Sequence, residues 1–181
     1  MRKRILELLR ASGSEPVSGE EISRKLEVSR TAIWKHIQTL KNEGYEIESV
    51  PKKGYILREA PDRLFPQEIT SRLKTKWLGH SICYQDSVDS TNNVAKAIAN
   101  GGCENGLMVV AEEQCSGKGR LSRGWISPYA KGIWFSVVLK PPFLPQEASK
   151  CTLLAAVSVV KTINKLKGVN AAIKWPNDVL L

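Results

Sequence analysis

Two short segments of the chain carry residue types that bind small anions, and the first spans residues 114–125. It reads Gln-Cys-Ser-Gly-Lys-Gly-Arg-Leu-Ser-Arg-Gly-Trp and holds three glycines, three cations and no acid. Glycines let the backbone approach a ligand closely, and Lys118, Arg120 and Arg123 can neutralise an anion held there. We therefore expect a loop over residues 115–124 that closes over a phosphorylated or carboxylated small molecule.

The second segment is Lys174-Trp-Pro-Asn-Asp178, which follows a short run typical of a strand. At the end of that strand, Lys174 would hold a carboxylate or phosphate oxygen. The alternative is structural: the Trp-Pro pair packs and turns the chain, and Asn177 and Asp178 form an Asx turn.

Polar side chains also follow two other strand-like runs. Asp89-Ser-Thr-Asn92 lies between a predicted strand and a predicted helix, and Gln114 ends a buried strand. Ligands of α/β sheets bind at the carboxyl ends of strands, so these residues would line a pocket in which Gln114 bonds an amide or ureido group. The alternatives are a helix N-cap made by Asp89 or Ser90 and a glutamine that is simply solvated. Because capping needs only one side chain, a cap and a pocket are compatible.

Composition limits the classes of protein to which the chain can belong. Its 181 residues are 42% hydrophobic and 25% charged, as in ordinary globular proteins. The four cysteines form no CxxC pair and there are two histidines, so we expect reduced cysteines and no metal site. Without a long apolar run or a signal core, the sequence predicts a cytoplasmic protein that does not contact membranes. The net charge of +9 permits nucleic-acid binding but does not locate it.

Residues 1–60 have the pattern of a winged helix-turn-helix domain. A first apolar helix is followed by Ser18-Gly-Glu-Glu21, which is a capping box for a second helix. Ser29 can cap a third helix with one apolar face, and Gly44 can end it. Two strand-like runs then flank Pro51-Lys-Lys-Gly54, which predicts a hairpin with a basic tip.

The exposed face of the third helix and the tip of the hairpin would contact DNA. In this interpretation the helix lies in the major groove and the lysines of the hairpin contact phosphates. The residues concerned are Ser29, Arg30, Thr31, Trp34, Lys35, Lys52 and Lys53. The alternative is a three-helix module that binds protein, with its charges merely solvated. The coincidence of turn, caps and hairpin favours DNA.

A linker around Ala60-Pro-Asp-Arg63 separates this domain from residues 64–181. A helix is expected over residues 64–78, and strands alternate with helices after it. The expected elements are strands over 82–85, 107–112, 133–139 and 172–174 and helices over 92–100 and 145–167. The apolar run Val179-Leu-Leu181 predicts one more strand, and such a run at a terminus suggests a sequence that has been cut short.

These features together resemble the bifunctional biotin protein ligases of the biotin operon repressor (BirA) type. The shared features, in the family's order, are the winged helix-turn-helix, Asp89-Ser-Thr-Asn92, Gln114, Gly117-Lys-Gly-Arg-Leu-Ser-Arg123 with Trp125, and Lys174-Trp-Pro-Asn-Asp178. The resemblance covers the whole chain and implies an α+β protein. A winged helix-turn-helix DNA-binding domain over residues 1–60 would precede an incomplete class II synthetase-like α/β catalytic domain, of the biotin/lipoate ligase kind, over residues 64–181.

The resemblance also implies an activity and partners. The family makes biotinyl-5′-AMP from biotin and ATP, with Mg²⁺ accompanying ATP, and transfers biotin to a lysine of the biotin carboxyl carrier domain of a carboxylase. In repressor members the adenylate is the corepressor at operator DNA, where a homodimer is expected. Two rival interpretations are a DNA-binding biotin sensor without turnover and a relative of the lipoate ligases. The helix-turn-helix and the Lys174 motif disfavour the second.

By position, the resemblance implies roles for the polar residues of these segments. Biotin would contact Ser90, Thr91, Asn92, Gln114, Lys118, Gly119, Arg120 and Lys174. The adenylate would contact Lys118, Arg120, Arg123, Trp125 and Asn177, and the catalytic residues would be Lys174 and Arg120. Asp178 could assist the incoming lysine.

The sequence departs from the family's pattern in two respects. The usual loop is GRGRxGR, so Lys118 and Ser122 differ from it, and lysine keeps the charge but loses the bidentate fork of arginine. The family also continues with a further strand and a small SH3-like domain that this sequence does not contain. We therefore expect little or no biotin transfer from the 181 residues by themselves.

Overall fold

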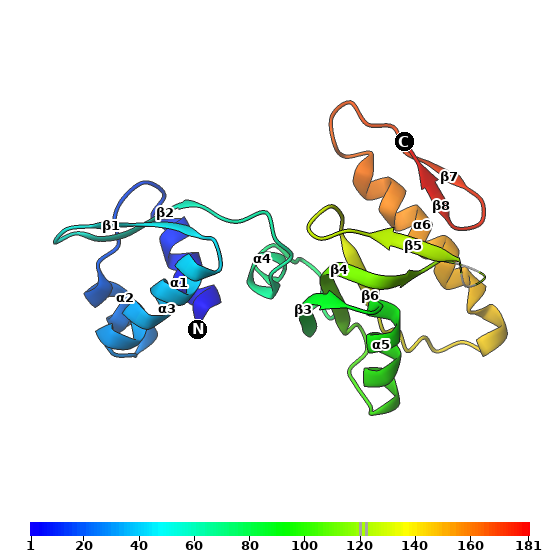
Figure 1. Cartoon of the computed structure of the whole chain (residues 1–181), viewed down its shortest axis with the longest axis horizontal. Helices are drawn as coiled ribbons and strands as arrows, with labels where there is room; N and C mark the ends of the chain where they lie inside the picture. The colour runs from blue at the N-terminus through cyan, green and yellow to red at the C-terminus, as the bar shows by residue number, and fades with distance from the viewer. Residues whose placement is uncertain (120, 122) are drawn as a thin grey trace. The chain divides into compact units, whose positions relative to one another are not determined.

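The structure, a computed structural model, describes the chain from residue 1 to residue 181 except for Arg120 and Ser122. Its contacts divide the chain into two compact units, residues 1–139 and residues 140–181 (Figure 1). The boundary at residues 60–64 lies within the first unit and stays a prediction of the sequence. In the described part of the chain, no helix combines the length and the apolar character needed to cross a membrane.

The first unit begins with three helices and a two-stranded hairpin, as predicted (Figure 1). These elements are α1 (Arg2–Ala11), α2 (Gly19–Leu26), α3 (Arg30–Asn42), β1 (Glu46–Val50) and β2 (Gly54–Glu59). The Ser18 side chain accepts a hydrogen bond from the backbone N–H of Glu21, and Ser29 caps α3 in the same way, so both predicted caps are confirmed. Gly44 follows α3 with a left-handed φ of 94° and confirms the predicted end of the helix.

The apolar faces of these elements form one buried core. Its members are Ile5, Leu6, Leu9, Val17, Ile22, Leu26, Ile33, Ile37, Leu40, Tyr45, Ile47 and Phe65. Ala32, which the sequence predicts on the apolar face of α3, is only partly buried. Val17 and Tyr55 exchange two backbone hydrogen bonds, of 3.0 and 2.9 Å, so the hairpin is also fixed to the segment that precedes α2.

The linker continues into a short helix, α4 (Pro66–Thr70). The longer helix predicted over residues 64–78 is therefore wrong. The hydroxyl of Ser71 donates to the carbonyl of Glu68 at 3.0 Å. Such local hydrogen bonds from serine offer the backbone an alternative to continued helix.

A buried carboxylate on α4 joins this helix to the first helices. Glu68 accepts hydrogen bonds from Arg10 Nη2 at 2.6 and 2.7 Å and from the Tyr45 hydroxyl at 2.7 Å. Its side chain is only 10% exposed. Burial and the bond to Glu68 raise the pKa of Tyr45, so the phenol stays a neutral donor. Because buried charges persist only when they are paired, this cluster fixes α4 in its position.

The rest of the first unit is a four-stranded mixed sheet with a helix between its parallel strands. The elements are β3 (Ile82–Val88), α5 (Thr91–Asn100), β4 (Met108–Lys118), β5 (Gly124–Ser127) and β6 (Trp134–Val137). β3 is parallel to β4, whereas β5 and β6 are antiparallel to the two ends of β4. Val109, Val110 and Ala111 are buried in the first half of β4, as their apolar run predicts.

β4 is longer than predicted, so the first part of the glycine-rich segment is a strand rather than a loop. The strand continues past Gln114, so that Gly117 pairs with Trp125 and Lys118 pairs with Gly124. Residues 115–118 are therefore strand, and the loop predicted over residues 115–124 begins at least four residues too early. Glycines have low strand propensity, but pairing with β5 across the hairpin outweighs this local preference.

The second unit consists of a helix followed by a hairpin. Its elements are the 3₁₀ turn η2 (Pro145–Glu147), α6 (Ser149–Ile163), β7 (Ala172–Lys174) and β8 (Asp178–Leu180). The helix predicted over residues 145–167 is thus too long at both ends. The Asn164 side chain bonds the N–H and the carbonyl of Ala171, at 2.5 and 3.2 Å, and turns the chain toward β7. Ile173 pairs with Val179, so the strand predicted at the final apolar run is confirmed.

Candidate functional site

Polar residues meet at the carboxyl ends of the parallel strands β3 and β4. Val88, the last residue of β3, pairs with Gln114 on β4, and α5 begins directly after β3, at Thr91. Both strands therefore deliver polar residues to the same edge of the sheet, which is where α/β sheets bind ligands.

Gln114 is the centre of this polar cluster. Its Oε1 accepts hydrogen bonds from the backbone N–H of Thr91 at 2.8 Å and from the Thr91 hydroxyl at 3.0 Å. Its Nε2 donates to Ser127 Oγ at 2.9 Å, and Thr91 Oγ1 lies 2.9 Å from Ser136 Oγ. Because the backbone N–H of Thr91 can only donate, it fixes the orientation of the Gln114 amide. Thr91 and Ser127 are both buried, so the cluster is a rigid hydrogen-bonded network at this edge of the sheet.

The segment between β3 and α5 follows its prediction only in part. Ser90 occupies the N-cap position of α5 and is buried, but its side chain makes no capping hydrogen bond, so the predicted side-chain cap is wrong. Asp89 instead accepts a hydrogen bond from Asn93 Nδ2 at 2.6 Å, which lowers the pKa of the Asp89 carboxyl. Asn92 is exposed on the first turn of α5.

Two of the basic residues predicted to bind an anion, Lys118 and Arg123, belong to the two arms of the β4–β5 hairpin and its turn. Lys118 Nζ donates to Asn93 Oδ1 at 3.3 Å, which links the hairpin to the start of α5. The backbone N–H of Gly119 donates to the carbonyl of Arg123 at 2.8 Å. Trp125 lies on β5 and is 58% exposed. Arg120 lies outside the described residues.

Gly117 allows the two strands of this hairpin to approach each other. A Cβ atom at this position would lie 2.5 Å from the carbonyl oxygen of Trp125 and 2.9 Å from Ser127 Oγ. A larger residue would push β5 away, and Ser127 would then lose its hydrogen bond with Gln114. The glycine is therefore needed for the polar cluster as well as for the hairpin.

Lys174 and Asn177 belong to the β7–β8 hairpin of the second unit. Lys174 ends β7, and its Nζ lies 3.9 Å from Asp178 Oδ2. Asn177 Nδ2 donates to Asp178 Oδ1 at 3.0 Å. The peptide bond between Trp175 and Pro176 is cis. Lys174 and its neighbour Trp175 are both exposed, so the hairpin presents a cation beside an aromatic ring.

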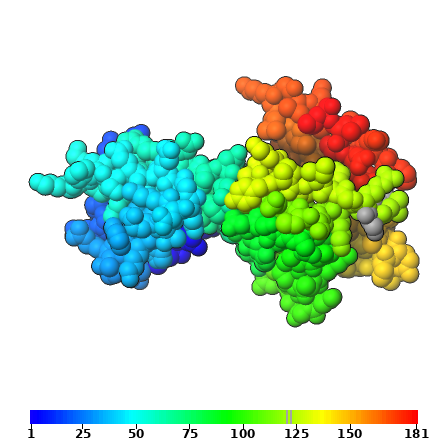
Figure 2. Space-filling model, viewed as in Figure 1, coloured from blue at the N-terminus to red at the C-terminus, as the bar shows by residue number. Residues whose placement is uncertain are grey.

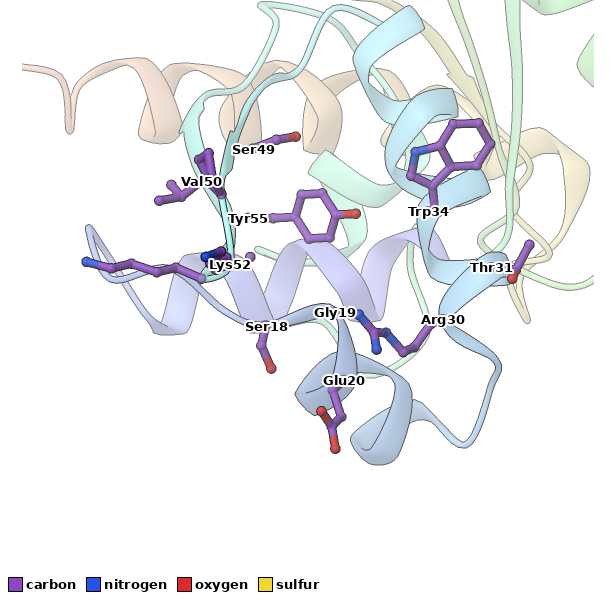
Figure 3. Close-up of a pocket in the computed structure, with 13 residues that line it drawn as sticks. Ser18, Gly19, Glu20, Arg30, Thr31, Trp34, Ser49, Val50, Lys52 and Tyr55 are labelled. Atoms are coloured by element: carbon purple, nitrogen blue, oxygen red, sulfur yellow. The ribbon is translucent and has the colours of Figure 1, made fainter.

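A groove lies between α3 and the β1–β2 hairpin. Arg30, Thr31 and Trp34 line it from α3, and residues of the hairpin and of the start of α2 line its other walls (Figure 3). Figure 3 shows the Tyr55 ring extending from the hairpin into this groove. Trp34 is 53% exposed although it is aromatic. Three cations, Arg30, Lys52 and Lys53, line the groove with one acid, Glu20, and this excess of positive charge suits an anionic partner.

Of the remaining predicted DNA contacts, Lys52 and Lys53 also line this groove. Lys52 and Lys53 are exposed at the tip of the hairpin, which projects from the surface in Figure 2. Lys52 adopts a left-handed φ of 61° within this turn. Lys35 is exposed on α3, and the Ser29 hydroxyl is occupied by its capping bond to Ala32.

Two family models match the chain. A helix-turn-helix domain matches residues 2–56, and the biotin/lipoate A/B protein ligase family matches residues 84–181, which is more than half of the chain. The chain belongs to the biotin/lipoate A/B protein ligase family. In this family member, the helix-turn-helix region therefore precedes the ligase region.

Several known proteins are similar to this biotin/lipoate ligase family member. It is 46% identical to the bifunctional ligase/repressor BirA of Bacillus spizizenii, over 100% of this chain and 56% of the relative. It is 34% identical to the protein of the same name from Escherichia coli, over 91% of this chain and 50% of the relative. The chain thus spans only about half the length of these relatives. A solved biotin protein ligase from Aquifex aeolicus in complex with biotin and ATP is 30% identical, with a TM-score of 0.48, over 56% of this chain and 42% of that one.

Sequence reasoning missed two hydroxyls of the polar cluster in this ligase-family chain. Ser127 and Ser136 reach Gln114 and Thr91 only because β5 and β6 pair with β4. The available signal was weak: Ser136 is a polar residue inside an apolar strand. Such residues need a buried partner, which the sequence alone does not name. Among the described residues no group of three or more histidine, cysteine or acidic side chains could hold a metal ion.

Proposed function

We propose that the chain acts as a bifunctional biotin protein ligase and biotin-responsive transcriptional repressor in the cytoplasm. Biotin and MgATP would give biotinyl-5′-AMP and pyrophosphate, and the adenylate would then pass biotin to a lysine of a biotin carboxyl carrier domain. Membership of the ligase family supports the proposed ligase activity. The helix-turn-helix match supports the proposed role as a repressor.

One observation carries the proposed ligand: the buried hydrogen-bonded cluster around Gln114. The ureido group of biotin offers one carbonyl acceptor and two N–H donors, which is the complement of an amide with hydroxyls beside it. Gln114, Thr91 and Ser90 supply these groups at the carboxyl ends of the strands. Asn92 would border the same pocket. An edge already hydrogen-bonded in this way is preorganised, which lowers the free-energy cost of binding.

The charged residues would serve the adenylate. Lys118, Gly119 and Arg120 would cover biotin and the phosphate, and Arg123, Trp125 and Asn177 would contact the adenylate. Lys174, with Arg120, would neutralise the charge that develops when the biotin carboxylate attacks the α-phosphorus of MgATP and pyrophosphate leaves. Fixed positive groups at that position are usually the largest contribution to such phosphoryl chemistry.

For DNA, α3 would lie in the major groove of an operator. Arg30, Thr31, Trp34 and Lys35 would meet base edges, and Lys52 and Lys53 would contact phosphates. Ser29, at the start of α3, would lie next to the backbone of the duplex. Two copies of the chain would bind two half-sites as a homodimer, with biotinyl-5′-AMP as corepressor.

The ligand assignment is tested by calorimetry with biotinyl-5′-AMP. Gln114→Ala is expected to weaken binding about 30-fold, because a buried hydrogen-bonding group is lost and its partners stay unpaired. Gln85→Ala, at an exposed position of β3, is the control and is expected to bind normally. No binding by the unchanged chain would disprove the proposed function. Normal binding by Gln114→Ala would remove only Gln114 from the site.

Turnover is measured separately, as transfer of labelled biotin to a carrier domain. Little or no transfer is expected from these 181 residues by themselves, so the assay is repeated with a longer chain that includes the family's further strand and SH3-like domain. Binding without transfer by that longer chain would favour a DNA-binding biotin sensor over a ligase. Where transfer is measurable, Lys174→Ala is expected to reduce it strongly without abolishing adenylate binding, because its charge is needed mainly while phosphorus is attacked. Undiminished transfer by Lys174→Ala would contradict its catalytic role.

The DNA assignment predicts two different kinds of defect in a fluorescence anisotropy titration with duplex DNA. Replacing Lys52 and Lys53 with alanine should weaken binding to all sequences alike and flatten its salt dependence, because phosphate contacts release counterions. Thr31→Ala should instead reduce the preference for the operator over other sequences. Glu59→Ala, on an exposed part of β2, is a control outside the interface. Equal salt slopes for the lysine variant and the unchanged chain would contradict the phosphate role.

A further inference from the structure

Arg63 has unusually many partners for a linker residue. Its Nη2 donates to the Tyr84 hydroxyl at 2.9 Å and to Asp86 Oδ1 at 2.5 Å. Its guanidinium carbon lies 5.1 Å from the ring centroid of Phe65 and 5.0 Å from that of Tyr129. The side chain is 22% exposed. A planar cation held between two rings and two oxygens is firmly oriented.

The charge that Arg63 balances is a buried carboxylate in the centre of the sheet. Glu112 on β4 has a side chain only 2% exposed, and its Oε1 lies 3.0 Å from Arg63 Nε, an ion pair without hydrogen-bond geometry. The same oxygen accepts hydrogen bonds from the backbone N–H of Leu64 at 2.9 Å and from the Tyr84 hydroxyl at 3.0 Å. Burial, with the bond to Asp86, raises the pKa of Tyr84, so that it stays protonated as a donor.

This carboxylate is close in sequence to the ligand cluster. Glu112 precedes Gln114 by two residues on β4, and alternate residues of a strand share one face of the sheet. Tyr129 follows Ser127 by two residues, and Ser127 accepts the hydrogen bond from Gln114. The backbone N–H of Ala130 donates to the carbonyl of Glu112 at 2.9 Å. Arg63 therefore contacts both of the chain segments that hold the Gln114 amide.

The residues that follow Arg63 belong to the amino-terminal core. Phe65 is 8% exposed and is a member of the core formed by the helices α1 to α3. Its ring lies 6.3 Å from that of Tyr45 and 5.3 Å from that of Tyr84. Glu68 then pairs with Arg10. One short segment thus contacts the helix-turn-helix core and the strands of the ligand cluster.

We propose that Arg63 is a positioning residue for the ligand site and couples its occupancy to the linker of the helix-turn-helix domain. Arg63 would hold the strand ends that carry Gln114 and Ser127, through Glu112 and Tyr129. This inference rests on the proposed binding of biotinyl-5′-AMP at Gln114. Coupling of this kind is reciprocal, so a ligand that fixes Gln114 also fixes the linker.

The first test is calorimetry with biotinyl-5′-AMP on the full chain. Arg63→Met keeps much of the side-chain volume but removes the charge, and it is expected to bind about tenfold more weakly. Arg63→Lys should recover part of the loss because the charge returns without the planar fork. Arg58→Met is the control, since within the part of the chain that the structure describes Arg58 forms an ion pair only with Glu48, and that pair is exposed. Normal affinity in Arg63→Met, with a binding-competent unchanged chain, would overturn this inference and leave the proposed function standing.

A double-mutant cycle separates positioning from a general structural role. If Arg63 acts through Gln114, then Arg63→Met should change the affinity of the Gln114→Ala protein by no more than about twofold. The same tenfold loss in both backgrounds would show that Arg63 acts elsewhere. Should Arg63→Met not fold, Tyr129→Leu takes its place in the cycle, because Tyr129 is 45% exposed and contributes one face of the stack.

The coupling itself is read from hydrogen exchange at the Leu64 amide, which donates to Glu112. Biotinyl-5′-AMP is expected to slow this exchange about tenfold or more in the unchanged chain, and not in Gln114→Ala at the same occupancy. Equal exchange with and without ligand, in a chain that binds it, would overturn the coupling. Failure of the unchanged chain to bind the ligand at all would instead remove the proposed function on which the inference rests.

Discussion

Gly54→Ala is expected to lower the free energy of unfolding of the amino-terminal domain by about 4 kcal/mol or more, one of the largest effects of a single methyl group in this chain. Gly54 has a φ of 128°, and a Cβ there would lie 2.1 Å from the carbonyl oxygen of Val17 and 2.5 Å from its carbonyl carbon. These atoms are backbone, and they belong to the residue that exchanges two hydrogen bonds with Tyr55. The methyl group would therefore separate the hairpin from the helices.

The measurement is urea denaturation followed by circular dichroism, with Gly13→Ala as the matched control. Gly13 also has a positive φ, 59°, but no atom of the described residues lies within 4 Å of a Cβ built there. The control should lose only about 1–2 kcal/mol from its backbone strain. Similar losses in the two variants would show that the close approach to Val17 does not matter. We also expect Gly54→Ala to lose DNA binding, because the groove needs the hairpin in place.

Glu68→Ala should destabilise the amino-terminal domain by about 3 kcal/mol. The substitution leaves Arg10 and the Tyr45 hydroxyl without the carboxylate that accepts their hydrogen bonds. Glu48→Ala is the control, because its pair with Arg58 is half exposed and such pairs contribute about 0–1 kcal/mol.

A second substitution distinguishes the loss of a pair from the loss of helix packing. Adding Arg10→Met to Glu68→Ala removes the uncompensated cation, and the double variant should recover part of the lost stability. If the double variant loses as much stability as the two single variants together, then the ion pair is not what attaches α4 to the first helices.

Much of the amino-terminal fold could be predicted because its signals are local. Ser18 and Ser29 cap helices with bonds that reach three residues along the chain, and Gly44 ends α3 through its own backbone geometry. The helix predicted over residues 64–78 failed although its apolar spacing suggested one. The segment instead ends its helix early and inserts Phe65 into a core built by other elements.

The polar cluster around Gln114 was only half predictable for the same reason. Thr91 and Gln114 stand out because polar residues at strand ends have a meaning in α/β sheets. Ser127 and Ser136 become partners only through the pairing of β5 and β6 with β4, and no local pattern specifies that pairing. The burial of Glu112 was not predicted, because the residues before it on β4 indicate only an apolar strand. The cation that allows this burial, Arg63, lies 49 positions earlier in the sequence.

Phe65 packs in the amino-terminal core and Glu68 pairs with Arg10, although both residues lie beyond the β1–β2 hairpin. A helix-turn-helix unit transferred from this chain to another protein should end after Thr70, not at the end of β2. A junction at residue 60 would leave the core without its Phe65 ring and Arg10 without Glu68. The transferable unit is therefore longer than the helix-turn-helix pattern suggests.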